Sequence, residues 1–165
     1  MMRRLLPLLA LALTACGLHP LYAGGASGTV GTTLRSVQVG PIDGQTGWLV
    51  RNKLIDRLSE SGNDTPRFRL DVKLDDNITG FGIRGDRAVT RERRTLRARY
   101  QLVNLATGGV VLDATAGSDA GIDVVSSEYA TVAAEQTAVE RLADVVADQI
   151  VARLGVYAAR TATAR

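Results

Sequence analysis

The residues whose type and spacing best suit chemistry in this chain are arginines. Seven of them fall within 16 residues, offset only by Asp86 and Glu92: Arg84, Arg87, Arg91, Arg93, Arg94, Arg97 and Arg99. Lys53 and Lys73 are the only lysines, so the positive charge is almost wholly guanidinium. This planar group binds phosphate and carboxylate through two parallel hydrogen bonds. The cluster therefore predicts a binding site for an anionic ligand or an acidic partner.

The sequence contains few residues that could form an active site. His19 is the only histidine and Cys16 the only cysteine, so a Ser-His-Asp site, a Cys-His site and a tetrahedral metal site all lack members. The segment Asp75-Asp76-Asn77 lacks the twelve-residue pattern of a calcium loop and is interpreted as a turn. We expect no enzymatic activity, no metal and no cofactor. A hydrolase that uses only Asp and Glu is the weakest alternative.

Residues 1–15 have the features of a signal peptide. Arg3 and Arg4 precede an apolar run that ends at Leu13, too short to span a hydrocarbon core of roughly 30 Å. The ending Leu13-Thr14-Ala15-Cys16 resembles the lipobox of bacterial lipoproteins, in which the cysteine is acylated and becomes the first mature residue. A single cysteine in an exported chain has no internal disulfide partner. We therefore expect Cys16 to carry the acyl chains that anchor the protein.

Composition is that of an ordinary globular domain. The 165 residues are 45% hydrophobic and 22% charged, which excludes collagen-like, coiled-coil and disulfide-scaffold classes. The formal net charge of +3 falls to about +1 once Arg3 and Arg4 are removed with the signal peptide. The overall charge therefore gives no reason to expect nucleic acid as a partner.

Alternation of apolar and polar residues predicts four strands. A short one covers 34–39, and the clearest runs strictly alternating over 67–75, with its second face charged. Residues 96–102 and 110–114 alternate in the same way around a turn at 106–109. The last three strands are expected to form an antiparallel meander.

Two amphipathic helices are expected at 46–61 and 127–154. The first has apolar residues at spacings of three and four, and the second has one long apolar stripe with Gly155 available as its stop. Trp48, on the first helix, is expected in the core. The element order is β-α-β-β-β-α.

These elements predict an α/β (α+β) fold, a two-layer sandwich in which two helices cover a four-stranded, mainly antiparallel sheet. The expected organisation is a signal peptide at 1–15, an acylated Cys and flexible tether at 16–33, the sandwich domain at 34–155 and a disordered tail at 156–165.

The arginine cluster then has two interpretations. If the alternation at 96–102 extends backward, Arg91, Arg93, Arg97 and Arg99 share one sheet face, opposite the apolar set. They are either a strip that binds phosphates and carboxylates of surface glycolipid, or a solvated face neutralised by Asp71, Asp75 and other neighbouring carboxylates. The cluster as a whole favours the binding role.

The segment from Cys16 to Tyr22, Cys-Gly-Leu-His-Pro-Leu-Tyr, together with the element order, resembles the LPS-assembly lipoprotein family of the LptE type, particularly its alphaproteobacterial branch. The resemblance implies an outer-membrane lipoprotein that sits as a plug in a large β-barrel of the LptD type, assists its assembly and binds lipopolysaccharide. It implies acylation at Cys16 and places glycolipid contact at Arg84, Arg87, Arg91, Arg93 and Arg94.

One other function stays open. The same sandwich could serve as a lipid-anchored periplasmic adaptor subunit of another envelope lipid or polysaccharide transport system, with neither barrel nor glycolipid as a partner. Stable association with an outer-membrane barrel separates the two.

Overall fold

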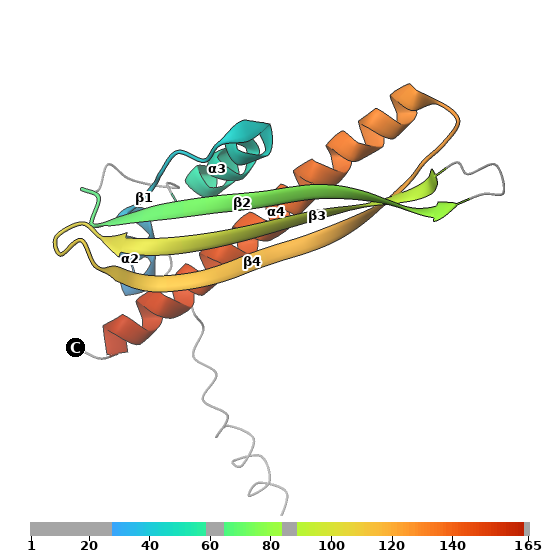
Figure 1. The fold of residues 1–165 in the computed structure, drawn as a ribbon. Helices are drawn as coiled ribbons and strands as arrows, with labels where there is room; N and C mark the ends of the chain where they lie inside the picture. The colour runs from blue at the N-terminus through green and yellow to red at the C-terminus, as the bar shows by residue number, and fades with distance from the viewer. Residues whose placement is uncertain (1–27, 59–64, 84–88, 164–165) are drawn as a thin grey trace, which may run out of the picture.

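Four strands form one mixed sheet in the residues that the structure, a computed structural model, describes: 28–58, 65–83 and 89–163. The strands are β1 (Val37–Val39), β2 (Phe68–Ile83), β3 (Val89–Asn104) and β4 (Val110–Asp123), and they lie in that order across the sheet. The short β1 runs parallel to β2, whereas β2, β3 and β4 are antiparallel to their neighbours (Figure 1). The predicted meander is confirmed.

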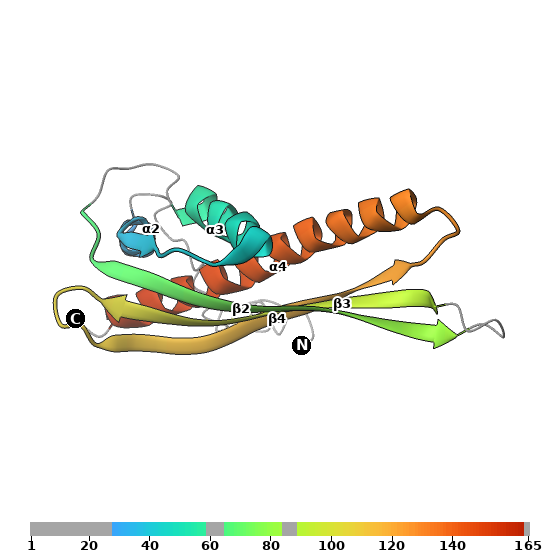
Figure 2. The same ribbon diagram turned by 45° about the horizontal axis from the view of Figure 1, so that its top comes forward.

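Among the described residues, three helices lie on one face of this sheet and none covers the other face (Figure 2). They are α2 (Thr29–Arg35), α3 (Gly44–Leu58) and α4 (Glu128–Thr163), which gives the order α-β-α-β-β-β-α. The two-layer α/β sandwich predicted from the sequence is therefore confirmed, with one additional helix. No helix within the described ranges is long and apolar enough to cross a membrane.

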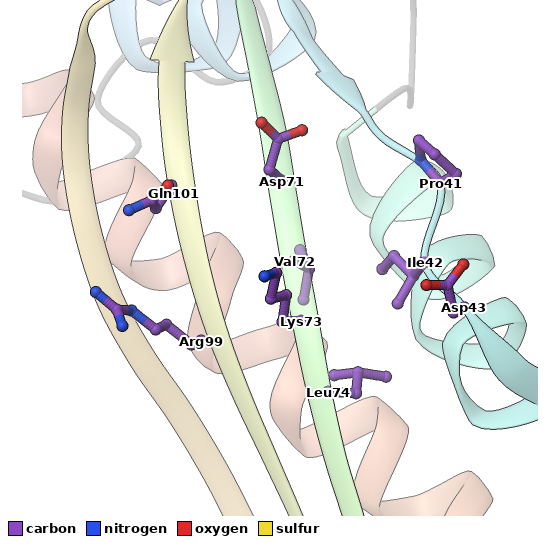
Figure 3. Close-up of a pocket in the computed structure, with 9 residues that line it drawn as sticks. All are labelled: Pro41, Ile42, Asp43, Asp71, Val72, Lys73, Leu74, Arg99 and Gln101. Carbon is purple, nitrogen blue, oxygen red and sulfur yellow. The ribbon is translucent and has the colours of Figure 1, made fainter.

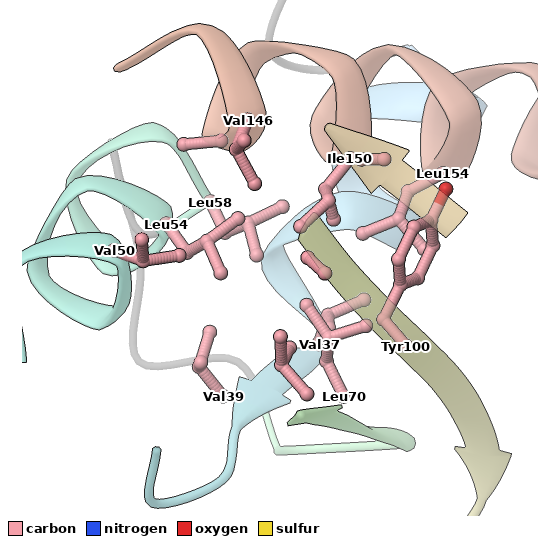
Figure 4. Packing of buried hydrophobic residues seen from close by; sticks show 14 of the residues in the cluster. Val37, Val39, Val50, Leu54, Leu58, Leu70, Tyr100, Val146, Ile150 and Leu154 are labelled. Carbon is pink, nitrogen blue, oxygen red and sulfur yellow. The ribbon is translucent and has the colours of Figure 1, made fainter. Parts of the chain in front are cut away.

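The core lies between the helices and the covered face of the sheet (Figure 4). Its largest fully buried side chains come from α3, α4, β2 and β3: Val50, Leu54, Leu58, Val146, Ile150, Leu154, Leu70, Leu96, Tyr100 and Leu102. Both helices bury residues three and four positions apart, and the strands bury every second residue. The apolar residues that recur every three or four positions in the helices and every second position in the strands thus form one buried layer.

The N-terminal part of the domain differs from its prediction. A helix occupies Thr29–Arg35, where a tether to residue 33 and a strand from residue 34 were expected. Val30 and Leu34, four residues apart, are both buried in the core cluster, and α2 packs against α4. Burial of these two side chains stabilises a helix that the small, polar residues around them do not favour. The strand is correspondingly shortened to Val37–Val39.

Helix α4 does not stop at Gly155. It continues to Thr163, so the disordered tail predicted at 156–165 is wrong for the residues described there. Ala158 is completely buried, and the ring of Tyr157 meets that of Phe68 edge-on, with centroids 6.3 Å apart. The apolar stripe therefore continues past the glycine, and packing on β2 holds the last turns.

A side chain of α4 occupies the free edge of β4 at one residue, Gly117. The Gln149 amide donates to the carbonyl of Gly117 (3.3 Å) and accepts from its N–H (3.0 Å), as a neighbouring strand would. A Cβ at Gly117 would lie 2.5 Å from Cδ of Arg97, so only glycine fits at this point without displacing that side chain. This contact protects an otherwise exposed edge.

Replacing Gln149 with Ala should remove both bonds and lower the free energy of unfolding by about 1 kcal/mol, since two exposed hydrogen bonds return to water. Urea denaturation of the full chain measures this loss. Gln136→Ala is the matched control, because the Gln136 amide bonds only to Glu140 on the same helix. An equal loss in both variants would contradict an edge-closing role for Gln149.

Candidate functional site

The uncovered face of the sheet carries alternate residues of β2, β3 and β4. The strand register places Lys73 beside Arg99, Asp75 beside Arg97 and Phe81 beside Arg91. On the other side of β3, Arg91 faces Asp123 and Gln101 faces Asp113. This face is where the arginine strip was expected.

The structure brings four of the seven predicted arginines together. Arg91, Arg93, Arg97 and Arg99 are exposed and alternate along β3 on the uncovered face, which confirms the backward extension of the strand. Arg94 lies between them in sequence and on the helix-covered face. Arg84 and Arg87, like Cys16, lie outside the described residues.

Three of these four guanidinium groups are already paired with carboxylates of β4. Arg91 lies 3.1 Å from Asp123, Arg97 lies 3.2 Å from Asp119 and Arg99 lies 3.0 Å from Asp113. Hydrogen bonds from Arg99 and Gln101 lower the pKa of Asp113, and those from Thr95 and Arg97 lower the pKa of Asp119. Exposed pairs of this kind add little stability, but they neutralise much of the strip. Neighbouring carboxylates were foreseen as a neutralising influence, although they come chiefly from β4 rather than from Asp71 and Asp75.

Arg93 is held differently. Its guanidinium carbon lies 5.4 Å from the centroid of the Phe81 ring, and none of the described carboxylates comes within ion-pair distance of it. A guanidinium over an aromatic face is oriented by the ring quadrupole while its N–H groups stay available. The end of the sheet that carries Phe81, Arg91 and Arg93 is therefore the part of the strip best able to accept a phosphate or carboxylate.

The sequence offered a signal for this arrangement that pattern reasoning passed over. Phe81 and Arg93 lie on adjacent strands and one diagonal step apart in the register, since Thr79 faces Arg93 and Phe81 faces Arg91. The strand predicted at 67–75 ends before Phe81. The contact between Phe81 and Arg93 could therefore not be predicted from the expected strands.

Arg94 has a structural role, in an ion pair with Asp76. Its guanidinium donates to both carboxylate oxygens of Asp76, at 2.9 and 2.6 Å, and to the backbone carbonyl of Glu135 in α4, at 3.1 Å. The Thr46 hydroxyl of α3 donates to the same carboxylate at 2.7 Å. The hydrogen bond from Arg94 outweighs the effect of burial and lowers the pKa of Asp76. One ion pair thus joins β2, β3, α3 and α4.

Replacing Arg94 with Met should leave this carboxylate without its cation and lower the free energy of unfolding by roughly 2–3 kcal/mol, somewhat below the cost for a fully buried pair. The loss should shrink as the pH falls below the ordinary pKa of an Asp, because protonation removes the charge that Arg94 stabilises. Arg97→Met, which breaks an exposed pair, should cost less than about 1 kcal/mol. If urea titrations gave equal losses in the free energy of unfolding for both variants, the Arg94 pair would stabilise the fold no more than an exposed pair does.

Two carboxyl groups meet close to this ion pair. Glu92 of β3 lies against Glu135 of α4, and one Glu92 oxygen is buried without a hydrogen-bond partner in the described residues. Desolvation, followed by the charge of Glu135 and a hydrogen bond to it, raises the pKa of Glu92. The ionised form of Glu92 is therefore unfavourable in the folded chain.

Glu92→Gln should consequently stabilise the chain at neutral pH, because an acid whose pKa is raised by folding destabilises the folded state above its unfolded pKa. Thermal melts from pH 4 to pH 8 should show a gain in Tm that is present at pH 7 and vanishes toward pH 4. Asp56→Asn on the exposed side of α3 is the control for a lost charge. A gain independent of pH would contradict the assignment.

A hollow of about 640 Å³ lies beside β2, between the strand and the chain that leads into α3 (Figure 3). Its lining mixes charges of both signs with apolar side chains: Pro41, Ile42, Asp43, Asp71, Val72, Lys73, Leu74, Arg99 and Gln101. The carboxylates of Asp43 and Asp71 make it a poor site for an anion. In the described residues no three His, Cys, Asp or Glu side chains are grouped to hold a metal ion.

Trp48 contradicts its prediction. It is 62% exposed on α3 rather than part of the core. The buried stripe of α3 consists of Gly47, Val50, Leu54 and Leu58, and Trp48 lies outside it. The prediction for Trp48 rested on residue type alone and did not consider its position relative to the buried stripe of α3.

Comparison with known protein families decides the relationship. The family model described as LptE, lipopolysaccharide-assembly, matches residues 34–154. The chain belongs to the LptE family. The matched range contains β1 to β4, all of α3 and most of α4, and so includes both faces of the sheet. LptE is a lipopolysaccharide-assembly lipoprotein family without enzymatic activity.

Solved structures show the same fold. A lipoprotein from Caulobacter crescentus CB15 is 24% identical, with a TM-score of 0.65 over 81% of this chain and 98% of that one. A minor lipoprotein from Acinetobacter baumannii is 13% identical (TM-score 0.54, covering 74% and 92%), and the rare lipoprotein B from Shewanella oneidensis is 12% identical (TM-score 0.53, covering 77% and 96%). A sequence comparison with curated proteins gives no match.

Proposed function

We propose that this LptE-family chain is an outer-membrane lipoprotein, anchored through acylated Cys16, that plugs and helps assemble an LptD-type β-barrel translocon. In this role it binds lipopolysaccharide during insertion into the outer leaflet. Family membership supports the role in lipopolysaccharide assembly. The charged, uncovered face of the sheet suits the hydrated interior of a barrel, because the strand faces there carry paired charges rather than apolar side chains.

The observation that carries glycolipid binding is the guanidinium of Arg93, held over Phe81 without a described carboxylate partner. Lipopolysaccharide combines phosphates and carboxylates with an apolar body. A cation beside an exposed aromatic ring can meet both parts at once. Arg91 lies on the same face and shares its exposed Asp123 partner with solvent. Arg97 and Arg99 are assigned to the ion-pair ladder of the sheet, and Arg94 to the core.

The barrel partner is tested by affinity purification of the full lipoprotein from detergent-extracted membranes of its own host, followed by mass spectrometry. A stoichiometric large outer-membrane β-barrel supports the translocon subunit. Recovery of an inner-membrane transport subunit, or of no partner, contradicts it and favours the periplasmic adaptor. Intact-mass measurement of the same sample tests acylation at Cys16.

Replacing Arg93 with Gln should weaken binding of purified lipopolysaccharide by the full lipoprotein about tenfold, the effect of losing one hydrogen bond between charged groups. Arg99→Gln changes the net charge equally but removes a guanidinium already paired with Asp113, so it should change binding less than about twofold. Titration at two salt concentrations measures both. Equal losses would indicate non-specific attraction to the whole strip and contradict a site at Arg93.

A further inference from the structure

The two edges of the sheet differ in how their backbone groups are covered. Gln149 closes the edge of β4 at Gly117, as described above. At the other edge, β1 pairs with β2 only from Phe68 to Leu70, and the last bond runs from the N–H of Gly40 to the carbonyl of Leu70 (2.9 Å). Pro41 has no N–H to continue the pairing, and the chain there turns away toward α3, which packs on α4 and β1. Within the described residues, β2 has no neighbouring strand beyond this point.

The direction of the backbone groups follows from the register. Pairing of β2 with β3 is continuous from Phe68 to Phe81, without a bulge. The N–H of Phe68 and the carbonyl of Leu70 both point toward β1. Every second residue after them therefore directs its N–H and C=O to the same open edge. These residues are Val72, Leu74, Asp76, Ile78 and Gly80, and no described backbone group bonds to them from that side.

The composition of β2 changes along this edge. Its first half carries Arg69, Asp71, Lys73 and Asp75, and charges of this kind are a usual protection of edge strands against pairing. Residues 77–83 contain no charged side chain. Ile78 and Phe81 are each 39% exposed in this second half. An unpaired, uncharged strand with exposed apolar side chains is suited to pair with another strand.

We propose that the edge of β2 from Asp76 to Gly80 is a strand-addition site for an extended, uncharged segment of the β-barrel partner. This inference rests on the proposed function for the identity of the partner. Backbone bonds to Asp76, Ile78 and Gly80 supply the affinity, and the exposed side chain of Ile78 supplies an apolar contact. The added segment is the fifth strand of the sheet. It is uncharged because a charge there would lose water without gaining an opposite charge on residues 77–83.

Amide hydrogen exchange of the full lipoprotein, measured by NMR alone and in the co-purified complex with the barrel, tests this proposal. In the free protein, the amides of Thr79 and Asn77 bond to β3 and should exchange slowly, whereas those of Ile78 and Gly80 should exchange rapidly. In the complex, the amides of Ile78 and Gly80 should become at least tenfold slower. The alternation distinguishes backbone pairing from general shielding, which would slow all four.

Two substitutions separate backbone from side chain. Ile78→Pro removes the N–H that points to the open edge together with the isoleucine side chain, and proline is tolerated on edge strands. It should reduce the recovered barrel several-fold while circular dichroism and Tm remain close to those of the wild type. Ile78→Ala keeps this N–H and should retain most of the barrel.

The outcomes are distinct. If no barrel co-purifies with the wild type, the proposed function fails. If the barrel co-purifies but the Ile78 and Gly80 amides stay rapid, strand addition alone is overturned. Slow exchange of these amides in the free protein also overturns it: concentration-dependent protection would assign the edge to a second copy, and concentration-independent protection would assign it to the chain itself.

Discussion

The arrangement of this domain depends on the ion pair between Arg94 and Asp76. It is the place where an arginine of the most basic strand lies on the covered side of the sheet, and it is satisfied from three directions by β2, α3 and α4. A guanidinium inside this layer is tolerated only because its donors reach carboxylate and carbonyl oxygens in good geometry. The same guanidinium ties α4 to the sheet, since the carbonyl of Glu135 is one of those acceptors.

With Arg94 turned inward, the remaining arginines of β3 follow from alternation. The strand displays Arg91, Arg93, Arg97 and Arg99 outward. Asp123 of β4 faces Arg91 in register, whereas Asp119 and Asp113 lie diagonally from Arg97 and Arg99. The result is a face of many charges with little net charge. At the end that carries Phe81, Arg93 makes no ion pair with a described carboxylate, although Asp119 is near enough for the two charges to interact.

The sequence was sufficient for the elements whose periodicity is strong. Alternation around Leu70 and Leu102, and the apolar stripe through Val146, Ile150 and Leu154, predicted the sandwich because burial imposes those spacings. It failed where tertiary packing outweighs local signals: at Val30 and Leu34, which stabilise α2, and at Gly155, which α4 passes through. For the site, alternation found the face of four arginines. Their partners on β4 could not be assigned, because strand register is set by contacts distant in sequence.

The amide of Gln149, bonded to both backbone groups of Gly117, has a consequence for assembly. A sheet that can add strands at both edges can propagate without limit, as fibrils do. Here a side chain of α4 occupies the edge of β4 at Gly117. Strand addition across Gly117 would first have to displace this side chain, so growth of the sheet is hindered at the β4 edge but not along the edge of β2.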